Sequence, residues 1–198
     1  MPRNSRLLVI MIIALFVSGC AGSSRYMKLV PEHESSYTPG GGRSLVIFMR
    51  PSGSAFAIQS SVFDITTGEN KLVGIVSAKK KVAYQTDPGE HMFMVIGESA
   101  DFMKADLQAG KTYYALVTPR MGAWKARFSL KPVHKDDLAS GKAKKWESSC
   151  KPVQNTDASY DWARKNAPSI QSKKEKFIKK WDEKPDSGKP MLNAEDGL

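Results

Sequence analysis

The chain has 198 residues, a formal net charge of +10 and 41% hydrophobic residues, which is typical of a globular protein with a sizeable core. Two cysteines are too few for a framework of several disulfides. The sequence also lacks the glycine-rich phosphate loops, dinucleotide fingerprints, nucleophile elbows and metal-ligand spacings that mark common enzyme classes.

Residues 1–19 have the three parts of a secretion signal. Arg3 and Arg6 give a positive start, residues 7–17 form an unbroken apolar run, and two small residues follow. The run of eleven residues is shorter than the roughly 20 residues that a permanent transmembrane helix needs. We therefore predict that this segment is a signal peptide that is removed on export. An uncleaved anchor is the alternative.

Four residues at the end of the signal, Val17, Ser18, Gly19 and Cys20, resemble the lipobox of bacterial lipoproteins. A cysteine thiolate is nucleophilic enough to accept diacylglycerol. The resemblance implies cleavage before Cys20 and acylation of its new amine, which anchors the protein to a lipid bilayer. Because Ala21 is not the aspartate that retains such proteins in the inner membrane, it further implies a cell envelope location at the outer membrane. The alternative is an ordinary secretion signal with a chance cysteine.

Cleavage would lower the formal net charge to +8, because the signal holds two arginines and no acidic residue. It would leave Cys150 as the one thiol besides the anchor. In an oxidising compartment a lone thiol is either buried or joined to another molecule, and we favour burial. Residues 20–42 are polar and end in three glycines, which predicts a lipidated, flexible tether.

Between residues 43 and 133, short runs rich in β-branched and aromatic residues alternate with turn residues, which is typical of an all-β domain. The run 91–96 is apolar throughout and predicts a central strand buried on both faces. Seven or eight strands at this spacing predict a mainly β fold, a single antiparallel β-sandwich followed by a C-terminal helical extension. The expected strands are 45–49, 56–65, 72–76, 82–86, 91–96, 102–107, 112–117 and 128–133.

Two turn motifs in this region, PGEH at 88–91 and AGKTYY at 109–114, each precede or open an apolar strand, and Arg50-Pro51 ends an earlier strand. Together they resemble the bacterial envelope family called domain of unknown function 2846, and also the related carboxypeptidase-regulatory-like and transthyretin-like β-sandwiches. The resemblance covers residues 44–133. It implies a sandwich fold and brings no established activity, so it implies no catalytic residue.

The histidines at positions 33, 91 and 134 lie far apart and near no cysteine or paired carboxylates. We therefore predict no catalytic residue, no metal site and no cofactor. His91 opens the predicted central strand, and we interpret it as a hydrogen-bonded turn residue rather than a catalytic base. Tyr113 and Tyr114 point to opposite faces of their strand, so one of them is expected in the core.

After residue 133 the chain becomes basic. Residues 141–184 contain twelve lysines or arginines against six acidic residues, and three of the four tryptophans. Thr156 or Asp157 is expected to cap a helix that reaches about Asn166, and a second helix is expected to follow Pro168. We predict a basic helical extension over residues 134–184 and a disordered tail over residues 185–198.

Three interpretations of the second helix remain open. Its apolar side can pack on the β domain and leave the lysines in water. It can instead lie on anionic lipid or lipopolysaccharide, or dock an envelope protein or an acidic cell-wall polymer. In the last two cases the contacts would come from the basic residues and the terminal tryptophan of the helix, which are Lys173, Lys176, Lys179, Lys180 and Trp181.

These features predict a membrane-anchored envelope lipoprotein that is not an enzyme and acts as a binding or scaffold module. The first alternative is a protein that contacts lipid or lipopolysaccharide through the basic C-terminal helix. The second is an envelope hydrolase whose catalytic residues are scattered along the chain. Because the protein is predicted to be exported, we do not expect nucleic acid among its partners.

Overall fold

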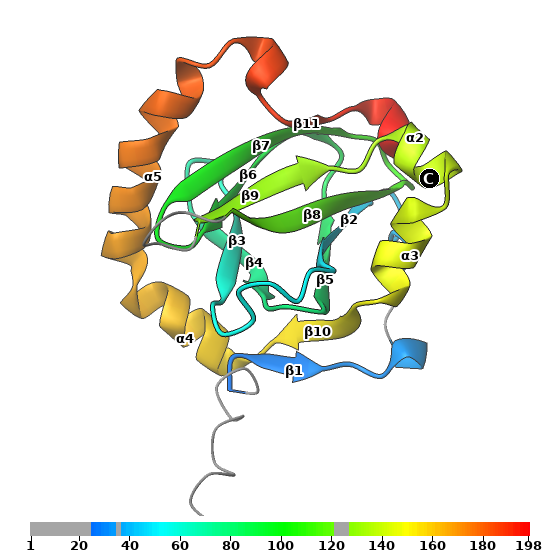
Figure 1. Ribbon diagram of the computed structural model, residues 1–198, viewed down its shortest axis with the longest axis horizontal. Coiled ribbons are helices and arrows are strands. Elements are labelled where there is room, and N and C mark those ends of the chain that lie inside the picture. Colours follow the sequence, from blue (N-terminus) through cyan, green and yellow to red (C-terminus); the bar gives the residue numbers. More distant parts are fainter. Residues whose placement is uncertain (1–24, 35–36, 121–126) are drawn as a thin grey trace, which may run out of the picture.

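The computed structural model describes residues 25–34, 37–120 and 127–198 (Figure 1). The predicted signal peptide and the lipobox residues, Val17, Ser18, Gly19 and Cys20, lie outside the described residues. Within the described ranges, no helix combines the length and the apolar character that a membrane-spanning helix requires.

The described residues contain eleven strands in two mixed sheets (Figure 1). The six-stranded sheet has the order β1 (Met27–Leu29), β10 (Lys151–Asn155), β5 (Lys80–Thr86), β2 (Ser44–Arg50), β8 (Thr112–Arg120) and β9 (Arg127–Pro132). The five-stranded sheet has the order β11 (Met191–Leu192), β7 (Ala100–Leu107), β6 (Gly89–Ile96), β3 (Ser60–Asp64) and β4 (Lys71–Val76). The pairs β10–β5, β2–β8 and β11–β7 are parallel, and the other neighbouring strands are antiparallel.

The prediction of a mainly β fold is confirmed, whereas the antiparallel sandwich of seven or eight strands is not. Each of the eight expected strands overlaps one of β2 to β9, although the strand expected from residue 56 begins only at Ser60. The additional strands β1, β10 and β11 have two to five residues, which is too short for an alternating pattern to be recognised. They join the edges of both sheets, partly in parallel pairs that hairpin motifs do not predict.

The main core lies between the two sheets, where Phe48 of β2 meets Phe93 of β6 with ring centroids 5.1 Å apart. On β6, Phe93 and Val95 belong to this core, while Met94 and Ile96 belong to a second apolar cluster on the other face of the sheet. The prediction that this strand is buried on both faces is therefore confirmed.

Helices cover the outer faces of both sheets. The second cluster lies beneath α4 (Asp157–Lys165) and α5 (Ala167–Asp182), from which Ile170 and Trp181 are buried. A third cluster lies beneath α2 (Lys135–Ala139) and α3 (Lys142–Ser148), on the outer face of the six-stranded sheet. Both predicted helices are present, and the interpretation that the second packs on the β domain agrees with the burial of Ile170 and Trp181.

Residues 185–198 are not a disordered tail in this structure. They form the short 3-10 helices η3 (Asp186–Gly188) and η4 (Ala194–Asp196), with β11 between them. Leu192 is fully buried in the main core, and the backbone of Leu198 exchanges two hydrogen bonds with Thr112. The prediction of disorder followed from the polar composition of this segment. That composition gives no sign that a single leucine, Leu192, anchors the segment in the core.

The expected tether and extension also contribute to the six-stranded sheet. β1, which is followed by the 3-10 helix η2 (Glu32–Glu34), pairs with β10, and β10 pairs with β5. Thr156 is the N-cap residue of α4, but its hydroxyl donates to the carbonyls of Arg25 and Tyr26 instead of accepting from the helix. The segments on either side of the predicted β domain are therefore integral parts of its fold.

Candidate functional site

One face of α3 and its C-cap residue line a groove beside the sheet. Lys145 and Trp146 lie three and four residues after Lys142, and the C-cap residue Ser149 lies four and three residues after them. A helix therefore places the four side by side. Ala143, on another side of the helix, is buried against the sheet. The short helix α3 therefore presents two ammonium groups and an indole beside the sheet.

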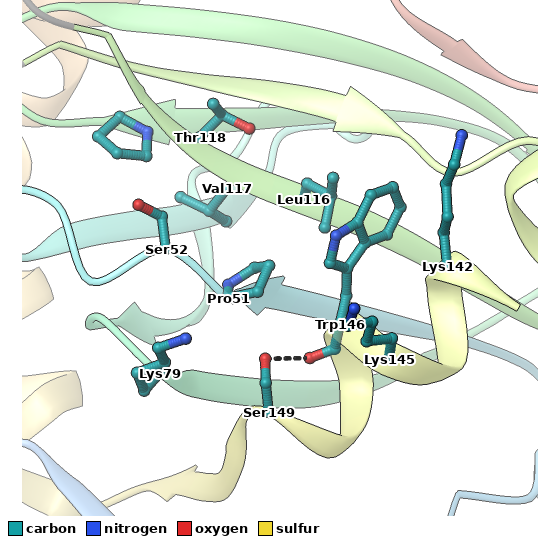
Figure 2. Close-up of a pocket in the computed structure, with 11 residues that line it drawn as sticks. Pro51, Ser52, Lys79, Leu116, Val117, Thr118, Lys142, Lys145, Trp146 and Ser149 are labelled. Atoms are coloured by element: carbon teal, nitrogen blue, oxygen red, sulfur yellow. Dashed lines mark hydrogen bonds between the residues drawn. The ribbon is translucent and has the colours of Figure 1, made fainter.

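The opposite wall of the groove comes from β8, from the loop after β2 and from the turn before β5 (Figure 2). In Figure 2, Trp146 and Lys142 rise together from α3, while Ser52 and Thr118 lie across from them. The volume of the groove is about 630 Å³, within the roughly 300–1,000 Å³ of small-molecule sites. We call it the basic groove; its lining residues are Pro51, Ser52, Lys79, Leu116, Val117, Thr118, Pro119, Lys142, Lys145, Trp146 and Ser149.

The charge of the basic groove has one sign. Three lysines line it, and its lining includes no carboxylate. The nearby Glu147 is turned instead toward the buried Lys81, with 3.5 Å between Oε1 and Nζ. Lys142 lies 3.4 Å from the carboxylate of Asp137, but its side chain is mostly exposed, so the pair is weak. The groove therefore has a local excess of positive charge.

A buried arginine holds the loop that forms one wall. The guanidinium of Arg50 donates to the backbone carbonyls of Ser54, Ala55 and Ile58, each at 2.7 Å. Ala55 adopts a left-handed conformation with φ 53°, which is unfavourable for a residue with a side chain. These contacts fix the loop over residues 51–59, and thereby the position of Pro51 at the groove.

Lys79 is held at the groove by its backbone. Its N–H donates to the carbonyl of Arg50 at 2.8 Å, and its carbonyl accepts from the N–H of Lys151 at 2.9 Å. The residue has φ 58°, so it too adopts the left-handed conformation that non-glycine residues seldom occupy. The backbone of Lys79 thus joins the end of β2 to the start of β10, while its exposed side chain lines the groove.

The α5 residues predicted to contact a membrane or a partner do not form one surface. Trp181 is only 3% exposed and packs edge-on against Phe102, so its role as a surface contact is wrong. Lys173 donates to the carbonyl of Gly97 at 2.7 Å and is half-buried. Lys176, Lys179 and Lys180 are exposed. Lys173 and Lys176 line a smaller hollow of about 400 Å³ that also contains the acidic residue Glu98.

A second cluster of polar side chains surrounds Asp64 at the end of β3. Its Oδ2 lies 3.2 Å from His91 Nδ1 and accepts a hydrogen bond from the Tyr84 hydroxyl at 2.9 Å, while Thr66 donates to Oδ1. Burial by itself would raise the pKa of Asp64, but the hydrogen bonds from His91, Thr66 and Tyr84 hold it at about 2. The carboxylate is therefore ionised at neutral pH.

The arrangement around His91 does not match a general base. Its Nε2 lies 2.9 Å from the carbonyl of Asp87, so both ring nitrogens face acceptors. Burial alone would lower the pKa of His91, but its hydrogen bonds to the Asp64 carboxylate and the Asp87 carbonyl raise it. Acceptors at both nitrogens are satisfied only when each nitrogen carries a proton, and neither nitrogen then has a lone pair with which to abstract one. This geometry agrees with our interpretation of His91 as a hydrogen-bonded turn residue.

The remaining candidate groups also have structural partners. Cys150 is buried, as we favoured, and burial raises the pKa of its thiol. Tyr113 lies in the core, while Tyr114 is half-buried on the opposite face of β8. Nowhere in the described ranges do three or more histidine, cysteine or acidic side chains gather as a potential metal site.

No family model matches the sequence, and no curated protein matches it. The likeness to domain of unknown function 2846 therefore rests on the turn motifs alone and stays a prediction. The geometry of the basic groove and the composition of its walls are the features that indicate a function.

Within the basic, tryptophan-rich segment, the sequence pattern favoured α5 for contacts, whereas the groove is lined by residues of α3. The long α5 has more lysines and a clearer amphipathic pattern, whereas α3 has seven residues and was not predicted. The spacing of Lys142, Lys145 and Trp146 is the signal that could have identified this face. The contributions of Pro51 and Lys79 could not have been identified, because they depend on the packing of separate segments.

Proposed function

We propose that this protein is an envelope lipoprotein, anchored to a bilayer through acylated Cys20, that acts as a non-enzymatic binding module. The basic groove is its binding surface, and its partner carries negative charge. One observation carries the proposal: three lysines and the indole of Trp146 line one groove whose lining has no acidic residue. The anchor would hold this groove near the outer membrane at a high effective concentration.

The anchoring part of the proposal is tested by metabolic labelling with an alkyne fatty acid. The wild-type chain should incorporate the label, and Cys20→Ala should not. Cys150→Ala serves as the matched control, because it removes the other cysteine and should leave labelling unchanged. Labelling that persists in Cys20→Ala would contradict the anchor.

The binding part is tested by sedimentation of the unlipidated chain over residues 21–198 with isolated envelope fragments. This chain contains every residue of the described fold. We expect it to sediment at low salt and to be released as salt rises, because exposed charges are screened. The double variant Lys142→Ala/Lys145→Ala should remain in the supernatant. Both side chains are exposed, so these changes should leave the fold intact.

The matched control is Lys179→Ala/Lys180→Ala, which removes the same charge from the exposed side of α5. It should sediment like the wild type. The alternative function, contact of lipid or lipopolysaccharide through the basic C-terminal helix, makes the opposite prediction for the two double variants. If the α5 variant loses binding and the groove variant keeps it, the alternative is supported and the groove is not the binding surface.

A further inference from the structure

The basic groove also indicates the chemical class of its ligand. We propose that it binds an anionic glycan, a chain of sugar rings that carry carboxylate or phosphate groups. This inference rests on the proposed function and deepens it. The observations behind it are the three types of group that line the groove: flat apolar rings, hydroxyl groups and lysine side chains.

The apolar surface that is available in the groove belongs to rings. Leu116 and Val117 line the groove but are 8% and 1% exposed, so they offer little aliphatic surface. Trp146, Pro51 and Pro119 are each half-buried and keep part of their ring exposed. Flat apolar faces of this kind match the C–H face of a sugar ring, whereas an acyl chain requires a slot of aliphatic side chains.

Hydroxyl groups line the same groove. Ser52 and Thr118 lie across from Trp146, and Ser149 lies beside the backbone of Trp146 (Figure 2). The hydroxyl of Ser52 accepts from the N–H of Ser54 at 3.1 Å, and that of Ser149 donates to the carbonyl of Trp146 at 2.8 Å. Each oxygen keeps further hydrogen-bonding capacity, because a hydroxyl has one donor and two acceptor positions. Sugar hydroxyls are suitable partners for these groups.

The three lysines supply the selection for charge. Lys79, Lys142 and Lys145 come from two separate segments and stand around the ring surface. An ammonium group is a compact charge that pairs with carboxylate and phosphate alike, so the groove selects for an anion without fixing its geometry. The groove can therefore distinguish an acidic sugar from a neutral one, because both can stack on the ring but only the acidic sugar pairs with the lysines.

The inference is tested with the chain over residues 21–198 and four probes, using calorimetry and tryptophan fluorescence at low salt. The probes are oligogalacturonate, phosphorylated maltohexaose, uncharged maltohexaose, and vesicles of phosphatidylcholine with phosphatidylglycerol. We expect binding of the two anionic glycans and about tenfold weaker binding of the uncharged one. Lys142→Ala/Lys145→Ala should raise Kd for the anionic glycans about tenfold, because it removes two partly screened contacts.

Trp146→Leu tests the stacking surface and keeps an apolar side chain against the cluster beneath α3. It should weaken all glycan binding and abolish the fluorescence change, while Lys179→Ala/Lys180→Ala should alter neither. Phe56→Ser tests the membrane as a competing partner, because Phe56 is 79% exposed on the loop over residues 51–59. It should leave glycan binding unchanged.

The outcomes separate this inference from the proposed function. Binding to the anionic vesicles alone, lost in the groove variant, would overturn the glycan ligand and leave the groove as a binding surface for membranes. Vesicle binding lost in Phe56→Ser but kept in the groove variant would overturn both the glycan ligand and the groove as the binding surface. Equal binding of charged and uncharged maltohexaose would overturn the selection for anions. If the groove variant binds every probe and envelope fragments as the wild type does, both the inference and the proposed function are overturned.

Discussion

The imidazole of His134 lies 2.9 Å, from Nδ1 to Oδ2, from the carboxylate of Asp196, which is 62 residues away in sequence. The same carboxylate accepts from the backbone N–H groups of Lys135 and Asn193. The side-chain amide of Asn193 also donates to Oδ2 at 3.3 Å, so four donors fix this almost fully buried carboxylate. The C-terminal segment is thereby fastened beside the start of α2, and it closes one edge of the five-stranded sheet through β11.

The C-terminal segment should contribute directly to stability. Leu192 is fully buried in the main core, so Leu192→Ala should lower the free energy of unfolding by about 2–4 kcal/mol. The neighbouring Met191 is 36% exposed, and Met191→Ala should have a much smaller effect. Urea denaturation of both variants, followed by circular dichroism, checks the difference. Equal, small losses would mean that the segment is not packed as described.

His91 should make stability depend on pH. Its pKa is raised in the folded protein, so it stabilises the fold fully below its unfolded pKa of about 6.5 and loses this contribution as pH rises through the folded value. The free energy of unfolding should therefore fall as pH rises above about 6.5. In His91→Gln, the free energy of unfolding should decrease less over the same rise in pH. The exposed His33 provides the control His33→Gln, which should keep the wild-type slope.

Asp64 should contribute on the acid side. Its folded pKa of about 2 lies below the unfolded value, so its contribution is present above about pH 4 and is lost as pH falls toward 2. At neutral pH, Asp64→Asn should lower the free energy of unfolding by about 2 kcal/mol. The loss should shrink as the pH is lowered, which urea titrations at pH 7, 4 and 3 can measure. A loss that is independent of pH would contradict the shifted pKa.

Arg50 should be required for the order of the loop over residues 51–59. Arg50→Lys keeps the charge but cannot donate to three carbonyls in the same arrangement, and we expect a loss of about 2–4 kcal/mol. Amide hydrogen exchange should also quicken around Ile58, whose N–H bonds to Ala55 within the loop. Arg120→Lys is the control, because that side chain is half exposed and pairs with Asp101 at 3.5 Å.

Cys150 should be unreactive in the folded protein. It is the one thiol of the chain over residues 21–198, it is 2% exposed, and burial raises its pKa, which keeps it in the unreactive thiol form. Ellman's reagent should modify it slowly at pH 7.5 and rapidly in denaturing urea. Fast modification of the native protein, or a disulfide-linked dimer on a non-reducing gel, would contradict the burial.

The sequence by itself determined the mainly β character and the positions of eight strands, because apolar runs and turn residues are local signals. It also indicated the doubly buried strand β6 and both C-terminal helices. The lipobox is likewise a local signal, and the prediction that it makes concerns residues outside the described structure. Local patterns identify elements, but they do not show which surfaces of those elements remain exposed.

The tertiary structure decided which basic residues share a surface. Trp181 is buried because it packs on Phe102. Trp146 is partly exposed and lines the groove between α3 and β8. The basic groove joins residues from β8, α3 and two loops, and its wall depends on the contacts of the buried Arg50. No single stretch of sequence contains this site, because it exists only where separate segments pack together.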